Sequence, residues 1–459
     1  MTEPAQPSPL PLVAPPHPTL AEATAVWARI GLLSFGGPAG QIALMHKELV
    51  EERRWISESR FLHALNFCML LPGPEAQQLA TYIGWLLHGT RGGIIAGTLF
   101  VLPGLVVILT LSALYASLYE ASWVASLFFG LKAAVLAIVI EALIRVGRRA
   151  LKNGVMLGLA GLAFVALFAF NIPFPLVILA AGLAGYVGTR INPAIFAASA
   201  HRAAVPDLPS VIGDGFTEPR PPLAVAVRTV LLWLGLWLLP LALILPVMGW
   251  SGTLAGLWLF FSQMAVVTFG GAYAVLAYVA QEAVQNFGWL QPGEMLDGLA
   301  LAETTPGPLV LVLSFVGFLA AYRDPGGLTP LLAGLLGGML TTWVTFVPCF
   351  LWIFLGAPYI ERLRTNAALS GALSAITAAV VGVILNLAVW FGLHVNFAQV
   401  DTLQLGPLNL ASPDWSSVRW MAIALTALAM LCVFRLKLGV LWTLAICGLA
   451  GLLVQLLPF

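Results

Sequence analysis

Long apolar runs separated by short polar stretches make up most of this chain. A transmembrane helix needs about 20 apolar residues. Runs that approach or exceed this length cover roughly residues 21–46, 62–88, 93–118, 122–144, 151–170, 173–189, 224–247, 253–281, 297–321, 328–357, 369–395, 419–434 and 438–457. The pattern predicts an all-α integral membrane protein with about 13 transmembrane segments.

The same set of landmarks occurs in both halves of the chain. Ser34-Phe35-Gly36-Gly37, Trp55 and Pro72-Gly73-Pro74 recur as Thr268-Phe269-Gly270-Gly271, Trp289 and Pro306-Gly307-Pro308. Each landmark recurs after 234 residues. Three unrelated landmarks at one offset indicate two homologous halves.

The repeated motifs interrupt apolar runs with Gly and Pro. Both residues break helices, and a broken helix survives at membrane depth only where protein or a wet cavity surrounds the freed backbone groups. Corresponding interrupted segments in the two halves of a transporter point to its binding site. We therefore expect helix breaks beside a site at Pro72, Gly73, Pro74, Pro306, Gly307 and Pro308.

The chain divides into four parts on this interpretation. Residues 1–20 are Pro-rich, lack Lys and Arg, and are expected to form a disordered tail rather than a signal peptide. Residues 21–189 form the first transporter repeat and residues 253–459 the second. Residues 190–252 hold a Pro-rich linker and a connecting transmembrane helix.

Basic residues in short loops predict which loops face the cytoplasm. The clusters are Arg145, Arg148, Arg149 and Lys152; Arg190, Arg202 and Arg220; Arg362 and Arg364; and Arg435 and Lys437. If all four lie inside, the N-terminus is cytoplasmic and the C-terminus external. The second repeat is then inverted relative to the first.

One charged loop fits this topology in two ways. Lys47, Arg53, Arg54 and Arg60 fall outside if both interrupted segments of the first repeat cross the membrane. They fall inside if both segments are re-entrant, and all other loops keep their sides. The sequence leaves these alternatives open.

Composition narrows the class of protein. The chain is 60% hydrophobic and 9% charged, whereas soluble domains carry about 25% charged residues. Its net charge of +1, without a basic run, argues against a nucleic-acid partner.

Cofactor chemistry has little support in the sequence. The four cysteines stand singly in apolar segments and are expected to be buried, reduced thiols. His46, His63 and His88 share no metal-ligand spacing, and no Gly-Lys-Ser/Thr phosphate loop occurs. We therefore expect no metal, no cofactor and no ATP-driven step in this chain.

The motifs resemble those of the chromate ion transporter family. The resemblance is carried by Leu33-Ser34-Phe35-Gly36-Gly37-Pro38-Ala39-Gly40-Gln41-Ile42-Ala43, by Glu51-Glu52-Arg53-Arg54-Trp55-Ile56 and by Leu70-Leu71-Pro72-Gly73-Pro74-Glu75-Ala76-Gln77-Gln78-Leu79-Ala80. It covers nearly the whole chain and is closest to the long, two-domain members. It implies export of chromate across the bacterial inner membrane, driven by the proton motive force and conferring chromate resistance, with sulfate as the structural mimic.

The second half departs from the motif. Ala272 replaces the proline after the glycines, and Leu309 stands where the first half has Glu75. The two halves are therefore not equivalent, and a site between them should be asymmetric.

A tetrahedral dianion needs hydrogen-bond donors and positive potential. Broken helices offer free backbone N–H groups and positive dipole ends. Glycines at the breaks allow close backbone approach, and hydroxyls stand at matching positions. The expected anion-binding residues are Ser34, Gly36, Gly37, Thr268, Gly270 and Gly271; the alternative is that the glycines serve helix packing alone.

Several side chains could complete the anion site. Lys132 lies about nine residues into its segment, where an isolated charge is costly and functional by default. A salt bridge to an acidic partner is the alternative. Gln77 and Gln78 are candidate donors to oxyanion oxygens, or amides in a helix interface. Arg29 either reaches the anion or extends to the membrane surface.

Two carboxylates are candidates for carrying the coupled proton. Glu75 follows the first Pro-Gly-Pro directly, and Glu303 precedes the second by three residues. Desolvation disfavours the charged form of a carboxylate and so favours proton uptake. The alternative is that such a residue caps a half-helix or faces a wet vestibule.

Other functions remain open at this stage. A sulfate or other oxyanion carrier shares the charge and shape of the substrate. An integral-membrane enzyme would need convergent carboxylates or a metal-binding His pair, which the chain lacks, and the flux of a channel would not depend on a proton gradient. The sequence also leaves open the proton stoichiometry and whether the protein forms a homodimer.

Overall fold

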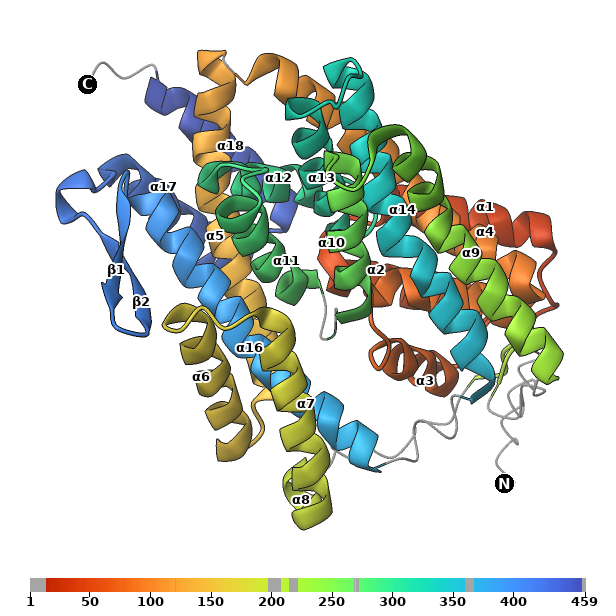
Figure 1. The fold of residues 1–459 in the computed structure, drawn as a ribbon. Helices are drawn as coiled ribbons and strands as arrows, with labels where there is room; N and C mark the ends of the chain where they lie inside the picture. The colour runs from red at the N-terminus through yellow and green to blue at the C-terminus, as the bar shows by residue number, and fades with distance from the viewer. Residues whose placement is uncertain are drawn as a thin grey trace, which may run out of the picture.

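A computed structural model describes residues 14–119, 121–196, 208–213, 222–267, 269, 272–359 and 367–455. These residues form a largely helical protein whose elements are labelled in Figure 1. The elements of the first half are α1 (Leu20–Leu33), α2 (Gly37–His46), the π-helical turn η1 (Lys47–Glu52), α3 (Glu58–Cys68), α4 (Glu75–Leu118), α5 (Ser122–Ala150), α6 (Gly154–Phe168), α7 (Phe174–Ile191) and the short α8 (Pro193–Phe196).

The connecting helix α9 (Leu223–Met248) leads into a second series of elements in a similar order. These are α10 (Thr253–Val267), α11 (Ala272–Gln281), η2 (Glu282–Asn286), α12 (Pro292–Glu303), η3 (Leu309–Leu311), α13 (Val312–Arg323), α14 (Pro330–Gly356), η4 (Ala357–Tyr359), α16 (Ala367–Asn396), α17 (Trp420–Met430), η6 (Leu431–Arg435) and α18 (Val440–Gln455).

The second half also contains a β-hairpin that the all-α prediction did not include. Strands β1 (Val400–Leu405) and β2 (Leu408–Pro413) pair antiparallel between α16 and α17, and a short helical turn, η5 (Trp415–Ser417), follows. Gly406 adopts a positive φ of 62° in the turn, which glycine allows at no steric cost.

The helices end at the Gly and Pro motifs. α1 ends at Leu33 and α2 begins at Gly37, because Gly36 and Gly37 have φ values of 84° and 70° that side chains rarely tolerate. The two Pro-Gly-Pro segments likewise lie between helices, with φ of 118° at Gly73 and 95° at Gly307. The interrupted helices are short: α2, α3 and α12 have 10, 11 and 12 residues, about 15–18 Å at a rise of 1.5 Å per residue.

Helix α4 turns back on itself at His88 and Gly89. Both residues leave helical geometry, with φ of −138° and 59°. The arms on either side pack closely, since a Cβ placed on Gly84 would lie 2.6 Å from Cβ of Ala96. α4 is therefore a hairpin of two antiparallel arms, in the place where two separate apolar segments, 62–88 and 93–118, were predicted.

Eleven apolar helices in the described part of the chain account for much of the predicted membrane domain. Six are long and apolar enough to cross a membrane: Glu75–Leu118, Ser122–Ala150, Phe174–Ile191, Leu223–Met248, Pro330–Gly356 and Ala367–Asn396. Five shorter ones are Gly154–Phe168, Thr253–Val267, Leu309–Arg323, Trp420–Arg435 and Val440–Val454. This architecture is that of an all-α membrane protein with one added β-hairpin.

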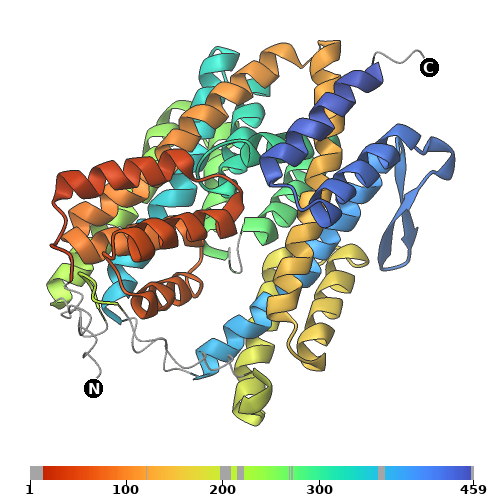
Figure 2. The ribbon, with the colours of Figure 1, turned by 180° about the vertical axis from the view of Figure 1, so that it is seen from behind.

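The long helices α5 and α16 each pack against helices of the opposite half. α5 packs against α17 and α18 of the second half, whereas α16 packs against α6 and α7 of the first (Figures 1 and 2). The contacts correspond closely: a Cβ on Gly451 of α18 would overlap the Ser126 carbonyl, and a Cβ on Gly185 of α7 would overlap the Gly371 carbonyl. Small residues thus bring the backbones of the two halves together.

The linker also contacts the first half. Ile212 N–H donates to the Trp55 carbonyl at 3.0 Å, and Ser57 N–H donates to the Ile212 carbonyl at 3.0 Å. This short parallel bridge holds the described linker residues 208–213 beside the charged loop between η1 and α3.

Candidate anion site at the helix breaks

The two halves meet where their helices are broken. The backbone N–H of Gly307 donates to the Ser34 carbonyl at 2.8 Å. The Gln41 amide donates from Nε2 to the Gly307 carbonyl at 2.6 Å. Ser34, Gln41 and Gly307 are all buried. We call the segment Ser34–Gln41 together with Pro306–Pro308 the break junction.

The start of α2 in the break junction leaves space around its backbone. Among the described residues, a Cβ on Gly36 would meet no atom within 4 Å, and one on Gly37 would be 3.9 Å from the Tyr273 hydroxyl. No side chain in the described part of the chain caps α2, and Pro38 has no N–H. The N–H groups in the first turn of α2 are therefore donors of the kind that bind anions. The Ser34 hydroxyl instead donates to the Ile30 carbonyl at 2.6 Å.

A buried carboxylate lies close to this helix start. The Tyr273 hydroxyl, at the start of α11, donates to Oε1 of Glu303 at 3.0 Å. Glu303 ends α12 and is 2% exposed. Tyr273 therefore connects Glu303 with Gly37 across the two halves.

The predicted anion ligands of the second half can be placed only partly. Thr268, Gly270 and Gly271 lie outside the described residues. Phe269, which lies among them in the sequence, and Ala272, the first residue of α11, are described.

The first Pro-Gly-Pro segment packs against the second half in a corresponding way. A Cβ on Gly73 would lie 2.8 Å from Sγ of Cys349 in α14. A Cβ on Gly104 of α4 would overlap the Pro306 carbonyl. Each Pro-Gly-Pro segment therefore contacts the residue that follows the mid-helix proline, Pro103 or Pro348, of the other half.

The two glutamines after Pro74 make local hydrogen bonds. Gln78 Nε2 donates to the Pro72 carbonyl at 2.7 Å, and Gln77 Nε2 donates to Oγ1 of Thr81 at 3.1 Å. Both side chains are fully buried, and their Oε1 atoms have no partner among the described residues. Glu75 is the first residue of α4 and is partly buried.

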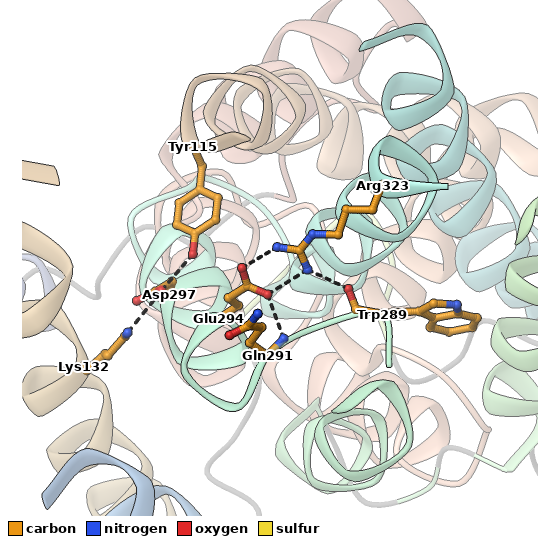
Figure 3. A network of polar contacts seen from close by, with 7 residues as sticks. All are labelled: Tyr115, Lys132, Trp289, Gln291, Glu294, Asp297 and Arg323. Atoms are coloured by element: carbon orange, nitrogen blue, oxygen red, sulfur yellow. Dashed lines mark hydrogen bonds and ion pairs between the residues drawn. The ribbon is translucent and has the colours of Figure 1, made fainter. Parts of the chain in front are cut away.

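Lys132 has an acidic partner that the sequence analysis did not identify. Its Nζ lies 3.3 Å from Oδ2 of Asp297, and the Tyr115 hydroxyl donates to the same oxygen at 2.9 Å (Figure 3). Asp297 is completely buried, whereas the Lys132 side chain is 21% exposed. The ion pair joins α5 to α12, which was the alternative to a free cation at mid-membrane.

Arg29 also has a carboxylate partner. Its Nη2 lies 3.5 Å from Oε1 of Glu48, and its side chain is 56% exposed. Arg53 contacts the other carboxylate oxygen of the same buried Glu48, Oε2, at 2.5 Å. Arg29 therefore belongs to a charged cluster with Glu48 and Arg53 rather than to the described contacts of the break junction.

The candidate residues therefore form two groups, each of which includes one carboxylate of α12. Ser34, Gly36 and Gly37 lie at the break junction with Glu303, and Lys132 lies with Asp297. Asp297 and Glu303 are both on α12, six residues apart, which is about 9 Å along the axis. Asp297 was not among the predicted site residues, although an acidic residue at the start of an apolar segment was a usable signal. Gln41, Tyr115 and Tyr273 were not among them either.

Comparison with known proteins identifies the family. The model for "Chromate transporter" matches residues 21–186 and 255–452. The chain is 31% identical to "Chromate transport protein" of Pseudomonas aeruginosa, covering 96% of this chain and 94% of the relative. It is 28% identical to "Probable chromate transport protein" of Synechococcus elongatus, covering 86% and 91% of the two chains.

A third relative also matches most of the chain, whereas no solved structure does. The chain is 28% identical to "Chromate transport protein" of Cupriavidus metallidurans, covering 80% of this chain and 82% of the relative. No solved structure matches significantly. The long-chain relatives and the two matched regions agree with the motifs and the two-part series of helices: the chain belongs to the chromate transporter family.

Proposed function

We propose that this protein exports chromate from the cytoplasm across the bacterial inner membrane, driven by the proton motive force, and so confers chromate resistance. The names of its relatives support the substrate. The break junction is the observation that carries the proposal, because it brings two interrupted helices of opposite halves together at an uncapped helix start. Interrupted helices at a repeat interface are where secondary transporters bind their substrates.

The proposed anion site is built from backbone groups and one cation. The first turn of α2, at Gly36 and Gly37, supplies N–H donors and a positive dipole end. Thr268, Gly270 and Gly271 are the proposed counterparts in the second half. Lys132 supplies the positive charge that a dianion needs, and Ser34 holds Gly307 in place through its carbonyl.

The proposed topology has inverted halves with re-entrant interrupted segments. Backbone pairing of Ile212 with Trp55 and Ser57 supports placing the linker and the charged loop on the same side of the membrane. The re-entrant alternative requires this placement. At the other side, the Thr253 hydroxyl donates to Asp324, and Asn409 N–H donates to the Ala169 carbonyl at 2.8 Å. With the basic clusters inside, the N-terminus is cytoplasmic and the C-terminus external.

Proton coupling is proposed to use buried carboxylates near the junction. Glu303 is the stronger of the two sequence candidates, because its Tyr273 partner lies beside Gly37. Glu75, at the start of α4, is the second. Each is tested by substitution with Gln, which keeps the shape and removes the exchangeable charge.

The test is uptake of labelled chromate into inside-out membrane vesicles that are energised by respiration. Export in the cell corresponds to uptake in these vesicles. We expect uptake that an uncoupler abolishes, that sulfate inhibits weakly, and that Lys132→Ala reduces at least about tenfold, since the site loses its cation.

Protein amount in the membrane is measured for each variant, with Arg435→Ala as a control for loss of a basic residue far from the junction in sequence. Stronger uptake of sulfate than of chromate would establish an oxyanion carrier of different specificity. Uptake that is insensitive to the uncoupler would indicate a channel. The absence of chromate uptake, with the protein present, would refute the assignment.

A further inference from the structure

Asp297 already forms an ion pair with Lys132, the cation that the proposed substrate needs. Lys132 Nζ is 3.3 Å from Asp297 Oδ2, at ion-pair distance. Lys132 retains 21% exposure of its side chain, whereas Asp297 has none. An incoming anion can therefore reach Lys132 from its exposed side, but it meets an ammonium group that already has a carboxylate partner.

Few other groups near Asp297 could stabilise its negative charge (Figure 3). Tyr115 donates to Oδ2, and Oδ1 is buried without a hydrogen-bond partner among the described residues. Glu294, one turn earlier on α12, has its own cation, Arg323 of α13, at 2.5 Å. Tyr119, whose ring contacts that of Tyr115, is a further titratable group nearby.

The other helices that pack on α12 bring no further charge to this position. α16 and α18 both contact α12 and contain no Lys, Arg, Asp or Glu. Lys132 is therefore the cation on which the ionised state of Asp297 depends in the described part of the chain. A buried carboxylate that loses its cation is strongly disfavoured in the charged form.

We propose that Asp297 is the intramolecular competitor of the anion for Lys132, and that it takes up one proton when the anion displaces it. This inference rests on the proposed function. The balance is simple: Lys132 stays protonated, the dianion replaces the carboxylate as its partner, and one proton from water binds Asp297. The protonated Oδ1 then has a donor for an oxyanion oxygen, where it now has no partner.

The direction of coupling follows from this exchange. In this exchange the anion and the Asp297 proton occupy the protein together and leave together, so the exchange itself carries out one net negative charge. The interior-negative membrane potential then drives export, while a pH gradient alone does not. Asp297 therefore has a role distinct from those proposed for Glu303 and Glu75, because it shares its cation with the substrate.

The test measures protons directly on the purified protein in detergent. Chromate is added at mildly alkaline pH, where it is already the dianion, in weak buffer with a pH indicator. We expect the wild type to take up about one proton per chromate bound. Asp297→Asn should take up none and should bind chromate at least about as tightly, because the competing charge is gone and the amide oxygen still accepts from Tyr115.

Glu294→Gln is the matched control, since it neutralises a buried, ion-paired carboxylate on the same helix; its proton uptake should persist. The wild type alone gives a second measurement in case Asp297→Asn fails to fold. Its chromate affinity should fall about tenfold per pH unit over the range in which Asp297 exchanges its proton.

The outcomes separate the two proposals. Chromate binding without proton uptake, or with unchanged affinity across that pH range, would overturn the role of Asp297 while leaving chromate transport intact. Proton uptake that persists in Asp297→Asn would do the same. A wild type that binds no chromate would refute the proposed function, and this inference with it.

Discussion

The backbone N–H of Gly307 donates a hydrogen bond to the carbonyl of Ser34, 2.8 Å away, so that the second Pro-Gly-Pro segment is attached to the first Phe-Gly-Gly break. Gln41 holds the Gly307 carbonyl on its other side. Both backbone groups of a residue between two helices are thus satisfied by the opposite half. This answers the requirement that a broken helix at membrane depth find partners for its freed groups.

Replacing Gln41 by Leu should weaken the break junction. The change leaves the buried Gly307 carbonyl without its side-chain donor, at a cost of about 1–3 kcal/mol. We expect a lower midpoint of thermal unfolding for the purified protein and reduced chromate uptake. Gln404→Leu, on the exposed strand β1, is the control and should unfold like the wild type. Equal unfolding midpoints for Gln41→Leu and the wild type would contradict the importance of this bond.

Replacing Gly104 by Ala should push the two halves apart. The added Cβ would overlap the Pro306 carbonyl and lie against Leu311, and backbone cannot yield as a flexible side chain can. Overpacking of this kind costs about 1–3 kcal/mol. Gly235→Ala in α9 is a matched control, because its Cβ would meet none of the described residues within 4 Å. Only Gly104→Ala should show a lower midpoint of thermal unfolding and reduced chromate uptake.

Removing Arg323 should leave a buried carboxylate without its cation. Arg323 forms two hydrogen bonds to Glu294 and one to the Trp289 carbonyl. We expect Arg323→Ala to cost about 1–3 kcal/mol, less than for a fully buried pair because the arginine is 42% exposed. Glu294→Gln introduced in the same chain should recover part of the loss. A double variant no more stable than Arg323→Ala would argue against an unpaired charge as the cause.

Labelling of introduced cysteines should place the charged loop on the cytoplasmic side. The four native cysteines are buried, so a membrane-impermeant maleimide will report mainly on new ones. We expect Lys47→Cys and Leu208→Cys to react in inside-out vesicles but not in intact spheroplasts, because their segments are held together by the Ile212 bridge. Trp415→Cys, beyond the β-hairpin, should react in spheroplasts. Reaction of Lys47→Cys in spheroplasts would show that the interrupted segments cross the membrane.

The helix breaks and the recurrence of the motifs were predictable from local sequence. Gly36, Gly73 and Gly307 adopt positive φ values, and that preference belongs to the glycine itself. A spacing of 234 residues between matching motifs is likewise visible without coordinates. Lys132 was also identifiable, because a charge within an apolar run is costly wherever its partner lies.

The partners of these residues were decided only by the tertiary structure. Gln41 meets Gly307 across 266 residues of chain, and Tyr115 meets Asp297 across 182. Such contacts depend on the exchange of α5 and α16 between the halves and on the turn of α4 at Gly89. Local propensity sets where a helix stops, whereas the choice of neighbour depends on how all the helices pack together. The sequence by itself therefore determined the class of protein, the recurrence of its motifs and its helix breaks. Only packing decided that the cation at Lys132 already has a carboxylate beside it.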